Sequence, residues 1–270
     1  MAYWFGGQLY SGTEISLAVD DPAFLYGATA FTTLRVYGGS LDHPLTHWAA
    51  HQTRLAQTLQ AVGWTAPNWD RLRQGLEQLL KEYPILRITC FPNGQELVTG
   101  RSLPPDLAAI QTEGIVAWVA RGEQYRRPLP AHKTGNYLGA WLALQAAQQH
   151  GAREAILVNA QGQWLETSTG NLWGWANGQW HTPGGTGLLA GIARQHILDA
   201  LSRQGQRVSQ APWPPGVIQR FEALAYSNSA VQVVPIHTVL GHTVPGDRSR
   251  LEINPQHPAL EALRAVFWEN

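Results

Sequence analysis

Lysine is rare in this chain, and its rarity narrows the search for amine chemistry. The basic residues comprise 17 arginines and two lysines, Lys81 and Lys133. Only a lysine forms an imine readily with a carbonyl compound, because the arginine guanidinium stays protonated. Lys81 stands in LEQLLKEYP, at the end of an amphipathic helical segment where a solvated cation suits the helix terminus. Lys133 stands in PLPAHKTGNYLG, between a proline-rich connection and a helix, and is the candidate for amine chemistry.

Three other short stretches supply the remaining parts of a cofactor site. ETSTGNLWG, residues 166–174, places an acid before small hydroxyl residues and a strand. GLLAGIARQ, residues 187–195, places a glycine before a helix, whose first backbone N–H groups favour a phosphate. SNSAVQVVPI, residues 227–236, places small polar residues in a turn between two strands. A pyridinium cofactor needs a lysine for its aldehyde, a carboxylate at its ring nitrogen and a phosphate cup, and the four stretches together offer all three.

With these motifs the chain resembles the fold-type IV pyridoxal-phosphate enzymes, which include branched-chain aminotransferases, D-amino-acid aminotransferases and 4-amino-4-deoxychorismate lyases. The resemblance runs from the N-terminal FGGQLY through AFTTLRVYGG and HQTRL to SNSAVQVVPI. It implies pyridoxal 5'-phosphate as the cofactor and an α+β fold of two lobes, the smaller one N-terminal. It also implies a homodimer with its sites near the subunit interface.

The resemblance gives roles to the residues that match the family motifs. Lys133 is the lysine that carries the cofactor as a Schiff base, and Glu166 is the carboxylate that pairs with the pyridine nitrogen. Tyr137 resembles a tyrosine that contacts the ring hydroxyl in the branched-chain enzymes, although the interval from Lys133 is one residue shorter here. The implied phosphate contacts are Arg54, Ile192, Ala193 and Ser229, and Asn228 is a further cofactor-binding residue. Ala193 replaces a threonine found in many members, so one side-chain contact to the phosphate is missing.

The stretch AFTTLRV separates the members of this family. Branched-chain aminotransferases typically have Phe-Glu-Gly-Ile-Arg here, whereas the lyases have Phe-Thr-Thr followed by Arg-Val, and residues 31–36 read FTTLRV. SNS at residues 227–229 also resembles the lyases. This likeness implies a lyase that releases 4-aminobenzoate, a folate precursor, and pyruvate from aminodeoxychorismate. Lys133 would remove the ring proton at the carbon bearing nitrogen, and Thr33 is the candidate proton donor to the departing enolpyruvyl methylene.

Two other hypotheses stay open at the level of sequence. A branched-chain or D-amino-acid aminotransferase would use the same Lys133 for proton transfer, and Thr32 and Thr33 would then only reflect β-propensity. A non-catalytic protein that has kept the fold is the third possibility, and the intact pair of Lys133 and Glu166 argues against it. Substrate carboxylates need cations, and the sequence does not choose among Arg35, Arg87, Arg101, Arg126 and Arg127.

The elements that must position these residues are helices and strands mixed without regular βαβ alternation, which favours two α+β lobes. We predict lobes over residues 1–121 and 133–270, joined by a linker over residues 122–132. Expected helices cover residues 47–62, 69–82, 137–150, 192–204 and, briefly, 216–221. Two short strands are expected around the Gly-Gly turn within residues 3–10. A hairpin that ends on a second Gly-Gly pair is expected over residues 28–41. Further strands are expected over residues 85–91, 96–99, 114–120, 155–158, 172–176, 179–181, 207–209, 223–227 and 231–239.

Composition narrows the class of protein. Charged residues are 14% and balanced at 19 against 19, so nothing in the charge favours nucleic acid or an anionic membrane. The start, MAYWFGGQLY, lacks the pattern of a signal peptide, and no apolar run has the length of a membrane helix. The single cysteine, Cys90, excludes an internal disulfide and suits a reducing compartment. We therefore predict a soluble, cytoplasmic protein, and the family resemblance implies an enzyme with a small-molecule substrate and no metal.

Overall fold

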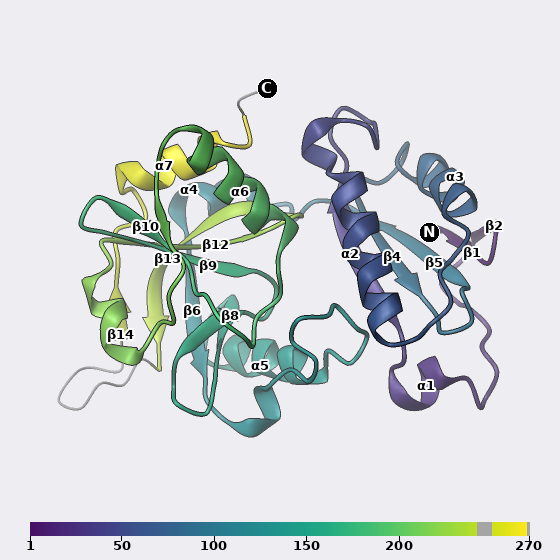
Figure 1. Cartoon of the computed structure of the whole chain (residues 1–270), viewed down its shortest axis with the longest axis horizontal. Coiled ribbons are helices and arrows are strands. Elements are labelled where there is room, and N and C mark those ends of the chain that lie inside the picture. The colour runs from purple at the N-terminus through teal and green to yellow at the C-terminus, as the bar shows by residue number, and fades with distance from the viewer. Residues whose placement is uncertain (242–249, 269–270) are drawn as a thin grey trace. The chain divides into compact units, whose positions relative to one another are not determined.

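The chain folds into two compact units, each with its own β-sheet (Figure 1). The structure, a computed structural model, describes residues 1–241 and 250–268. Unit 1 comprises residues 1–105 and 132–136, and unit 2 comprises residues 106–131 and 137–270. The predicted α+β fold with a smaller N-terminal and a larger C-terminal lobe is confirmed. No helix of residues 1–241 and 250–268 is both long and apolar enough to cross a membrane.

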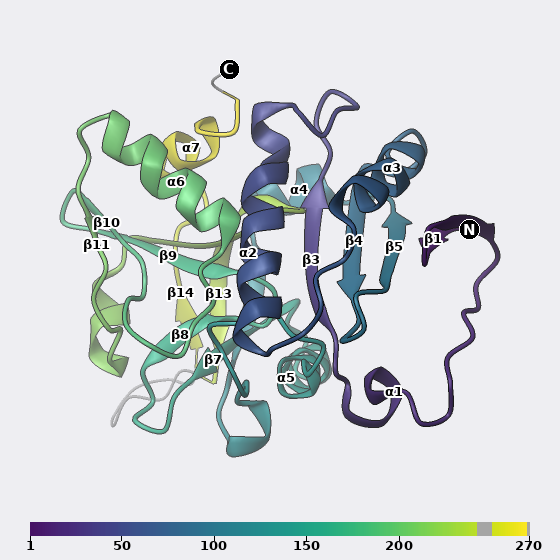
Figure 2. The same ribbon diagram turned by 45° about the vertical axis from the view of Figure 1, so that its right-hand side comes forward.

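Unit 1 is an antiparallel sheet with two helices on one face. The strand order is β2-β1-β5-β4-β3, with β1 Ala2–Phe5, β2 Gln8–Ser11, β3 Ala30–Arg35, β4 Ile85–Cys90 and β5 Glu96–Arg101. The helices are α1 Pro22–Tyr26, α2 Trp48–Ala61 and α3 Trp69–Leu79, with a 3₁₀ turn at Pro44–Thr46. Leucines of α2 and α3 form one buried core with Trp4, Leu34, Ile88 and Val98 of the strands, and α2 lies along β3 (Figure 2).

Strand β3 presents two chemically different faces, because successive side chains of a strand point to opposite sides. Ala30 and Leu34 belong to the core beneath α2, and Thr32 between them is fully buried. Phe31, Thr33 and Arg35 therefore point to the opposite face. We call the side of the sheet opposite α2 and α3 the open face.

The predicted hairpin over residues 28–41 is wrong. Strand β3 pairs antiparallel with β4, which comes after two helices, and only an isolated bridge between Tyr37 and Ser40 closes the Gly38-Gly39 turn. The predicted Gly-Gly hairpin at the N-terminus is confirmed as β1 and β2, with Gly6 and Gly7 at positive φ.

Unit 2 is a larger mixed sheet surrounded by helices. Its strand order is β11-β10-β9-β12-β13-β6-β7-β8, and β14 pairs with β13. The strands are β6 Ile115–Ala120, β7 Glu154–Val158, β8 Trp164–Thr167, β9 Asn171–Ala176, β10 Gln179–His181, β11 Val208–Ser209, β12 Ala223–Asn228, β13 Gln232–Leu240 and β14 Arg250–Glu252. The α-helices are α4 Leu107–Glu113, α5 Leu138–Gln149, α6 Ile192–Arg203 and α7 Pro258–Ala265, and 3₁₀ turns lie at Glu123–Tyr125 and Pro215–Arg220. Alanines of α5 pack closely on β6 and β7.

The structure divides the chain at different residues from the prediction. The predicted N-terminal lobe ended at residue 121, but β6 pairs in parallel with both β7 and β13 and so belongs to unit 2. Most of the predicted linker over residues 122–132 also packs in unit 2, and residues 132–136 return to unit 1. The hydrogen bonding of β6, rather than the proline-rich composition that follows it, determines where unit 2 begins.

Candidate functional site

Lys133 lies on a short segment that the backbone ties to strand β3. The Phe31 N–H donates to the Lys133 carbonyl at 2.8 Å, and Thr134 forms a bridge with Ala30. Gly135 lies so close to the preceding loop that an added Cβ would stand 2.0 Å from the Thr29 hydroxyl oxygen and 2.7 Å from the Gly27 carbonyl oxygen. The segment is therefore held at a fixed position beside β3, and Lys133 with it.

The side chain of Lys133 shares the surroundings of Phe31 on the open face. Its Nζ lies 4.7 Å from the centroid of the Phe31 ring, and the Cζ of Arg87 lies 3.6 Å from the same centroid. Thr33 is the next residue on this face of β3, and its cross-strand partner is Arg87. Unit 1 thus brings the predicted lysine and the predicted proton donor Thr33 to one face of one sheet.

Arg54 lies on the helix-covered side of the same strand. Its NH2 group donates to the Thr32 hydroxyl at 2.9 Å, and that hydroxyl lies 2.6 Å from His51 Nδ1. Burial, together with the charges of Arg54, His47 and Lys133, holds the pKa of His51 well below its usual range. Arg54 is half-buried, whereas Thr32 and His51 are buried. Thr32 and His51 were not predicted as partners of Arg54, although the three-residue spacing of His51 and Arg54 puts them on one face of a helix.

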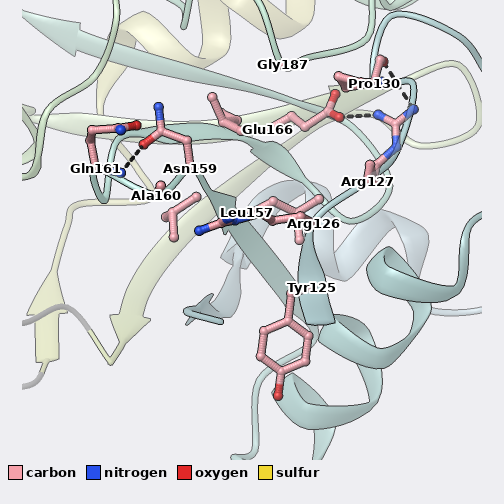
Figure 3. A pocket seen from close by; sticks show the side chains of 12 residues that line it. Tyr125, Arg126, Arg127, Pro130, Leu157, Asn159, Ala160, Gln161, Glu166 and Gly187 are labelled. Atoms are coloured by element: carbon pink, nitrogen blue, oxygen red, sulfur yellow. Dashed lines mark hydrogen bonds and ion pairs between the residues drawn. The ribbon is translucent and has the colours of Figure 1, made fainter. Parts of the chain in front are cut away.

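Glu166 lies in unit 2 in a buried ion pair that the sequence did not predict. Its Oε1 accepts from Arg127, and both side chains are about 95% buried (Figure 3). Its Oε2 accepts from the Leu189 N–H at 3.0 Å, with Asn171 Nδ2 at 3.5 Å. The guanidinium of Arg127 lies 4.7 Å from the centroid of the Tyr137 ring, so Tyr137 and Glu166 share one arginine. Arg127, Leu189 and Asn171 thus hold the Glu166 carboxylate in a fixed orientation.

A cavity of about 310 Å³ in unit 2 has Glu166 and Arg127 in its wall. Figure 3 shows the two side chains facing each other at one end of it. The remaining wall comes from the connection before Lys133, from β7 and its turn, and from Gly187. Of the five arginines considered for substrate carboxylates, Arg127 is committed to Glu166, and Arg126 forms an exposed pair with Glu123 at 3.2 Å.

The N-terminus of helix α6 has the features of an anion site. Gly191 is the N-cap residue and supplies no side-chain cap, while Ile192 and Ala193 occupy the first turn and are buried. A Cβ at Gly191 would stand 2.0 Å from Asn171 Oδ1, so the position has no room for a capping side chain. The first N–H groups of a helix attract a phosphate under these conditions.

Asn228 shapes the turn that carries Ser229. Its Oδ1 accepts from the N–H groups of Ala230 and Val231, each at 2.9 Å. Its Nδ2 lies 3.4 Å from the Thr169 hydroxyl. Asn228 therefore acts on the backbone of the turn, and Ser229, half-buried, follows it directly.

Glu154 organises the loop between β8 and β9. Its carboxylate accepts from the hydroxyls of Ser168 and Thr169 and from the Ala155 N–H. Burial raises the pKa of this carboxyl, while the hydrogen bonds act in the opposite direction. Because its oxygens accept hydrogen bonds from the loop, Glu154 has a structural role, in contrast to the cofactor role predicted for Glu166.

Each unit by itself supplies groups of the kinds that a phosphorylated pyridine ring needs. Unit 1 supplies a half-buried lysine amine at Lys133 and a half-buried guanidinium at Arg54. Unit 2 supplies the buried carboxylate of Glu166, an acceptor of the kind that a ring N–H needs, and the start of α6, where Gly191 supplies no side-chain cap. The predicted residues thus fall into two sets, one in each unit. The sequence around Arg127 did not predict its pairing with Glu166, because nothing in the tripeptide of residues 126–128 distinguishes one arginine from the other.

Comparison with known proteins identifies the family. The family described as Amino-transferase class IV matches residues 29–239. Among curated relatives, the chain is 27% identical over 98% of its length and 91% of the other chain to a branched-chain-amino-acid aminotransferase of Pseudomonas aeruginosa. It is 24% identical over 87% and 90% of the two lengths to an aminodeoxychorismate lyase of Vibrio harveyi. A protein of Synechocystis provisionally named branched-chain-amino-acid aminotransferase is 30% identical over 63% of this chain and 53% of its own length.

Solved structures agree on the fold. A branched-chain aminotransferase of Thermoproteus uzoniensis superposes with a TM-score of 0.82 at 19% identity, covering 99% of this chain and 93% of the other. A structure provisionally named 4-amino-4-deoxychorismate lyase gives a TM-score of 0.75 at 29% identity, covering 96% and 98%. The match of the family over most of the chain, together with this shared fold, shows that the protein belongs to the class IV aminotransferases.

Proposed function

We propose that this class IV enzyme is a 4-amino-4-deoxychorismate lyase that releases 4-aminobenzoate and pyruvate. Its cofactor is pyridoxal 5'-phosphate, in keeping with neighbours in the family such as the Mycobacterium tuberculosis aminotransferase solved in a PLP-bound form. Both lyases and aminotransferases are among the relatives at similar identity, so the choice between the two reactions rests on the residues of this chain.

The observation that carries the proposal is the position of Thr33. Its side chain belongs to the same open face as Phe31, whose ring contacts the Lys133 ammonium group at 4.7 Å. A proton donor for the leaving group has to act on the same substrate as the lysine that removes the ring proton. A shared face on one sheet supports that assignment for Thr33.

The proposed roles follow from the chemistry of each side chain. Lys133, as a neutral amine, removes the proton from the ring carbon that bears the substrate nitrogen, and Thr33 delivers a proton to the enolpyruvyl methylene as the C–O bond breaks. Pyridoxal phosphate, when bound, supplies an electron-withdrawing pyridinium. Glu166 holds the proton on the ring nitrogen, because a carboxylate beside that nitrogen favours its charged form. Aromatisation of the substrate ring drives the reaction.

The charge of the open face supports a substrate with two carboxylates. Arg35 and Arg87 project from neighbouring strands of this face, and Arg101 follows on the next strand, opposite Ile85. Thr33 and Thr99 flank Arg87 across the sheet, and Thr89 follows Arg87 on the same face of β4. A branched-chain amino acid would instead favour an apolar surface for its side chain. We propose that Arg35, Arg87 and Arg101 include the cations for the substrate carboxylates.

The proposal extends to assembly and location. We propose a homodimer, as the family resemblance implies, with cofactor contacts from Lys133, Glu166, Arg54, Tyr137, Ile192, Ala193, Asn228 and Ser229. We also propose a cytoplasmic location, where the single, buried Cys90 is compatible with reducing conditions.

A pair of assays tests the function. Wild-type enzyme is incubated with aminodeoxychorismate, and separately with amino acids plus 2-oxoglutarate. We expect release of 4-aminobenzoate and pyruvate in the first assay. Thr33→Val keeps the shape of the side chain but removes the hydroxyl, so we expect release to slow by roughly 10²- to 10⁴-fold, the usual contribution of a general acid. Thr33→Ser, which keeps the hydroxyl and removes only the methyl group, should retain much of the wild-type rate.

Each other outcome has a definite meaning. Wild-type transamination without any 4-aminobenzoate identifies the aminotransferase alternative and overturns the lyase proposal. A normal lyase rate in Thr33→Val moves the proton donor to another residue, with Lys133 the next candidate. A protein that has neither activity and no near-visible cofactor absorption is the non-catalytic scaffold.

A further inference from the structure

Three side chains of unit 1 form a buried hydrogen-bonded chain behind strand β3. Thr32 is fully buried and His51 is 99% buried, and the Thr32 hydroxyl lies between His51 Nδ1 at 2.6 Å and Arg54 NH2 at 2.9 Å. Neither Thr32 nor His51 has a role in the lyase chemistry described above. A buried polar chain of this kind is retained only where its groups satisfy one another.

The chemistry of the guanidinium fixes the direction of one of these hydrogen bonds, and the tautomer of His51 sets the direction of the other. A guanidinium only donates, so the Thr32 oxygen accepts from Arg54. The single hydroxyl hydrogen of Thr32 is then available for His51 Nδ1, which accepts it when the imidazole is neutral with its proton on Nε2. The lowered pKa of His51, caused mainly by burial, agrees with a neutral ring.

We propose that Thr32 and His51 are positioning residues that hold the Arg54 guanidinium ready for the cofactor phosphate. The inference rests on the proposed role of Arg54 as a phosphate contact. An arginine side chain loses considerable rotamer freedom when it is ordered, and a group that is ordered before binding does not lose it again on binding. The hydrogen bond to Thr32 orients the planar guanidinium, a group whose fork of donors matches the oxygens of a phosphate.

The inference gives the two adjacent threonines separate tasks. Thr32 and Thr33 have the same side chain, but they point to opposite faces of β3. Thr32 is connected to Arg54 and affects cofactor binding, whereas Thr33 is on the face of Lys133 and affects the chemical step. The pair therefore supplies its own matched control.

The test compares binding of pyridoxal phosphate and of pyridoxal to the apoprotein, because the two ligands differ only in the phosphate. Dissociation constants are measured for wild type, Thr32→Val, Arg54→Gln, the double variant and Thr33→Val. We expect Thr32→Val to weaken pyridoxal phosphate by about tenfold or more, the usual effect of losing a hydrogen bond to a charged group, and to leave pyridoxal unchanged. Thr32→Ser should restore the affinity, and Thr33→Val should not alter it. The ³¹P chemical shift of the bound phosphate should move in Thr32→Val alone among the threonine variants.

The double variant separates positioning from general loss of structure. If Thr32 acts through Arg54, Thr32→Val has little further effect once Arg54→Gln is present, so the two effects are not additive. Equal weakening of pyridoxal and pyridoxal phosphate in Thr32→Val, or full additivity, would overturn the inference. Equal affinities in Arg54→Gln and wild type would overturn it too, independently of whether the enzyme is a lyase or an aminotransferase.

A second route covers the case in which Thr32→Val does not fold. His51→Leu removes the acceptor at Nδ1, and His51→Asn places an amide near the same position. We expect His51→Leu to weaken pyridoxal phosphate but not pyridoxal, and His51→Asn to stay close to wild type. The reverse ranking of these two variants contradicts the inference.

Discussion

At the scale of the residue, the two lysines of the chain stand in contrasting surroundings. Lys133 is half-buried with its Nζ over the Phe31 ring, whereas Lys81 is exposed after the end of α3. We expect Lys133→Ala to abolish covalent attachment of the cofactor and the near-visible band that borohydride removes. The one other lysine of the sequence is Lys81, which is 52 positions away. Lys81→Ala is the control and should keep both. A normal borohydride-sensitive band in Lys133→Ala contradicts the assignment.

Glu166 gives a second prediction at this scale. Glu166→Gln keeps an acceptor for Leu189 but removes the charge opposite Arg127 and the proposed ring nitrogen. We expect the variant to bind cofactor but to lose much of its turnover, because a neutral amide does not favour the protonated ring. The buried charge of Arg127 is then uncompensated, so the free energy of unfolding should fall by about 3 kcal/mol. Chemical denaturation and steady-state rates measure the two effects, and undiminished turnover would reassign the carboxylate role.

The sequence indicates candidate reactive groups but not the partners that the structure gives them. Lys133 was identified because lysine chemistry has no substitute and only two lysines exist. The ion pair of Arg127 with Glu166 joins residues that are 39 positions apart, and neither side chain carries a local pattern that marks the other. Arg54 was predicted from its motif. Its contact with Thr32 depends on the packing of α2 against β3, which the sequence did not predict.

At the scale of the element, the segment over residues 132–136 depends on close backbone approach. An alanine at position 135 would place its Cβ 2.0 Å from Thr29 Oγ1 and 2.7 Å from the Gly27 carbonyl oxygen. We expect Gly135→Ala to displace the segment that carries Lys133, to destabilise the fold by about 1–3 kcal/mol and to slow attachment of the cofactor. Gly216→Ala is the control, since no atom lies within 4 Å of an added Cβ there. Thermal denaturation and the rate of appearance of the near-visible band measure both variants, and a wild-type attachment rate in Gly135→Ala contradicts the expectation.

The elements themselves followed their sequence patterns to different degrees. Long amphipathic segments predicted α2, α3, α5 and α6 to within a few residues, because the helical period is local. Strand β8, which carries Glu166, was missed because its four residues are too short for a clear alternation. The predicted partner of β3 was wrong because antiparallel pairing between residues fifty or more positions apart leaves no local mark.

At the scale of the whole molecule, the sequence predicted two lobes but not the path of the chain between them. Residues 106–131 belong to unit 2 and residues 132–136 to unit 1. The proline-rich composition near residue 128 marks a connection, yet the parallel pairing of β6 with β7 and β13 decides the unit to which the preceding strand belongs. Such long-range pairing is a tertiary property that composition does not encode.

Assembly is the last property at this scale, and helix α1 bears on it. None of its residues is buried within the chain, and Phe24, Leu25 and Tyr26 are 71%, 51% and 75% exposed. Val19, just before the helix, is 87% exposed. We call Val19, Phe24, Leu25 and Tyr26 the α1 patch. Aromatic and aliphatic side chains gathered in this way are typical of the centre of a protein interface.

We expect the wild-type protein to sediment as a homodimer, with the α1 patch at its interface. Replacing Phe24 and Tyr26 together by serine should raise the dimer dissociation constant by at least about tenfold, because truncation of aromatic interface anchors commonly has an effect of that size. The fold of the subunit should stay intact, since α1 contributes no buried side chain to it. Trp268→Ser is the control, because Trp268 is 71% exposed in unit 2 and lies outside the patch. Sedimentation velocity over a range of concentrations measures the dissociation constants. A wild-type protein that is monomeric and fully active contradicts the dimer, and a serine double variant that dimerises like wild type places the interface elsewhere.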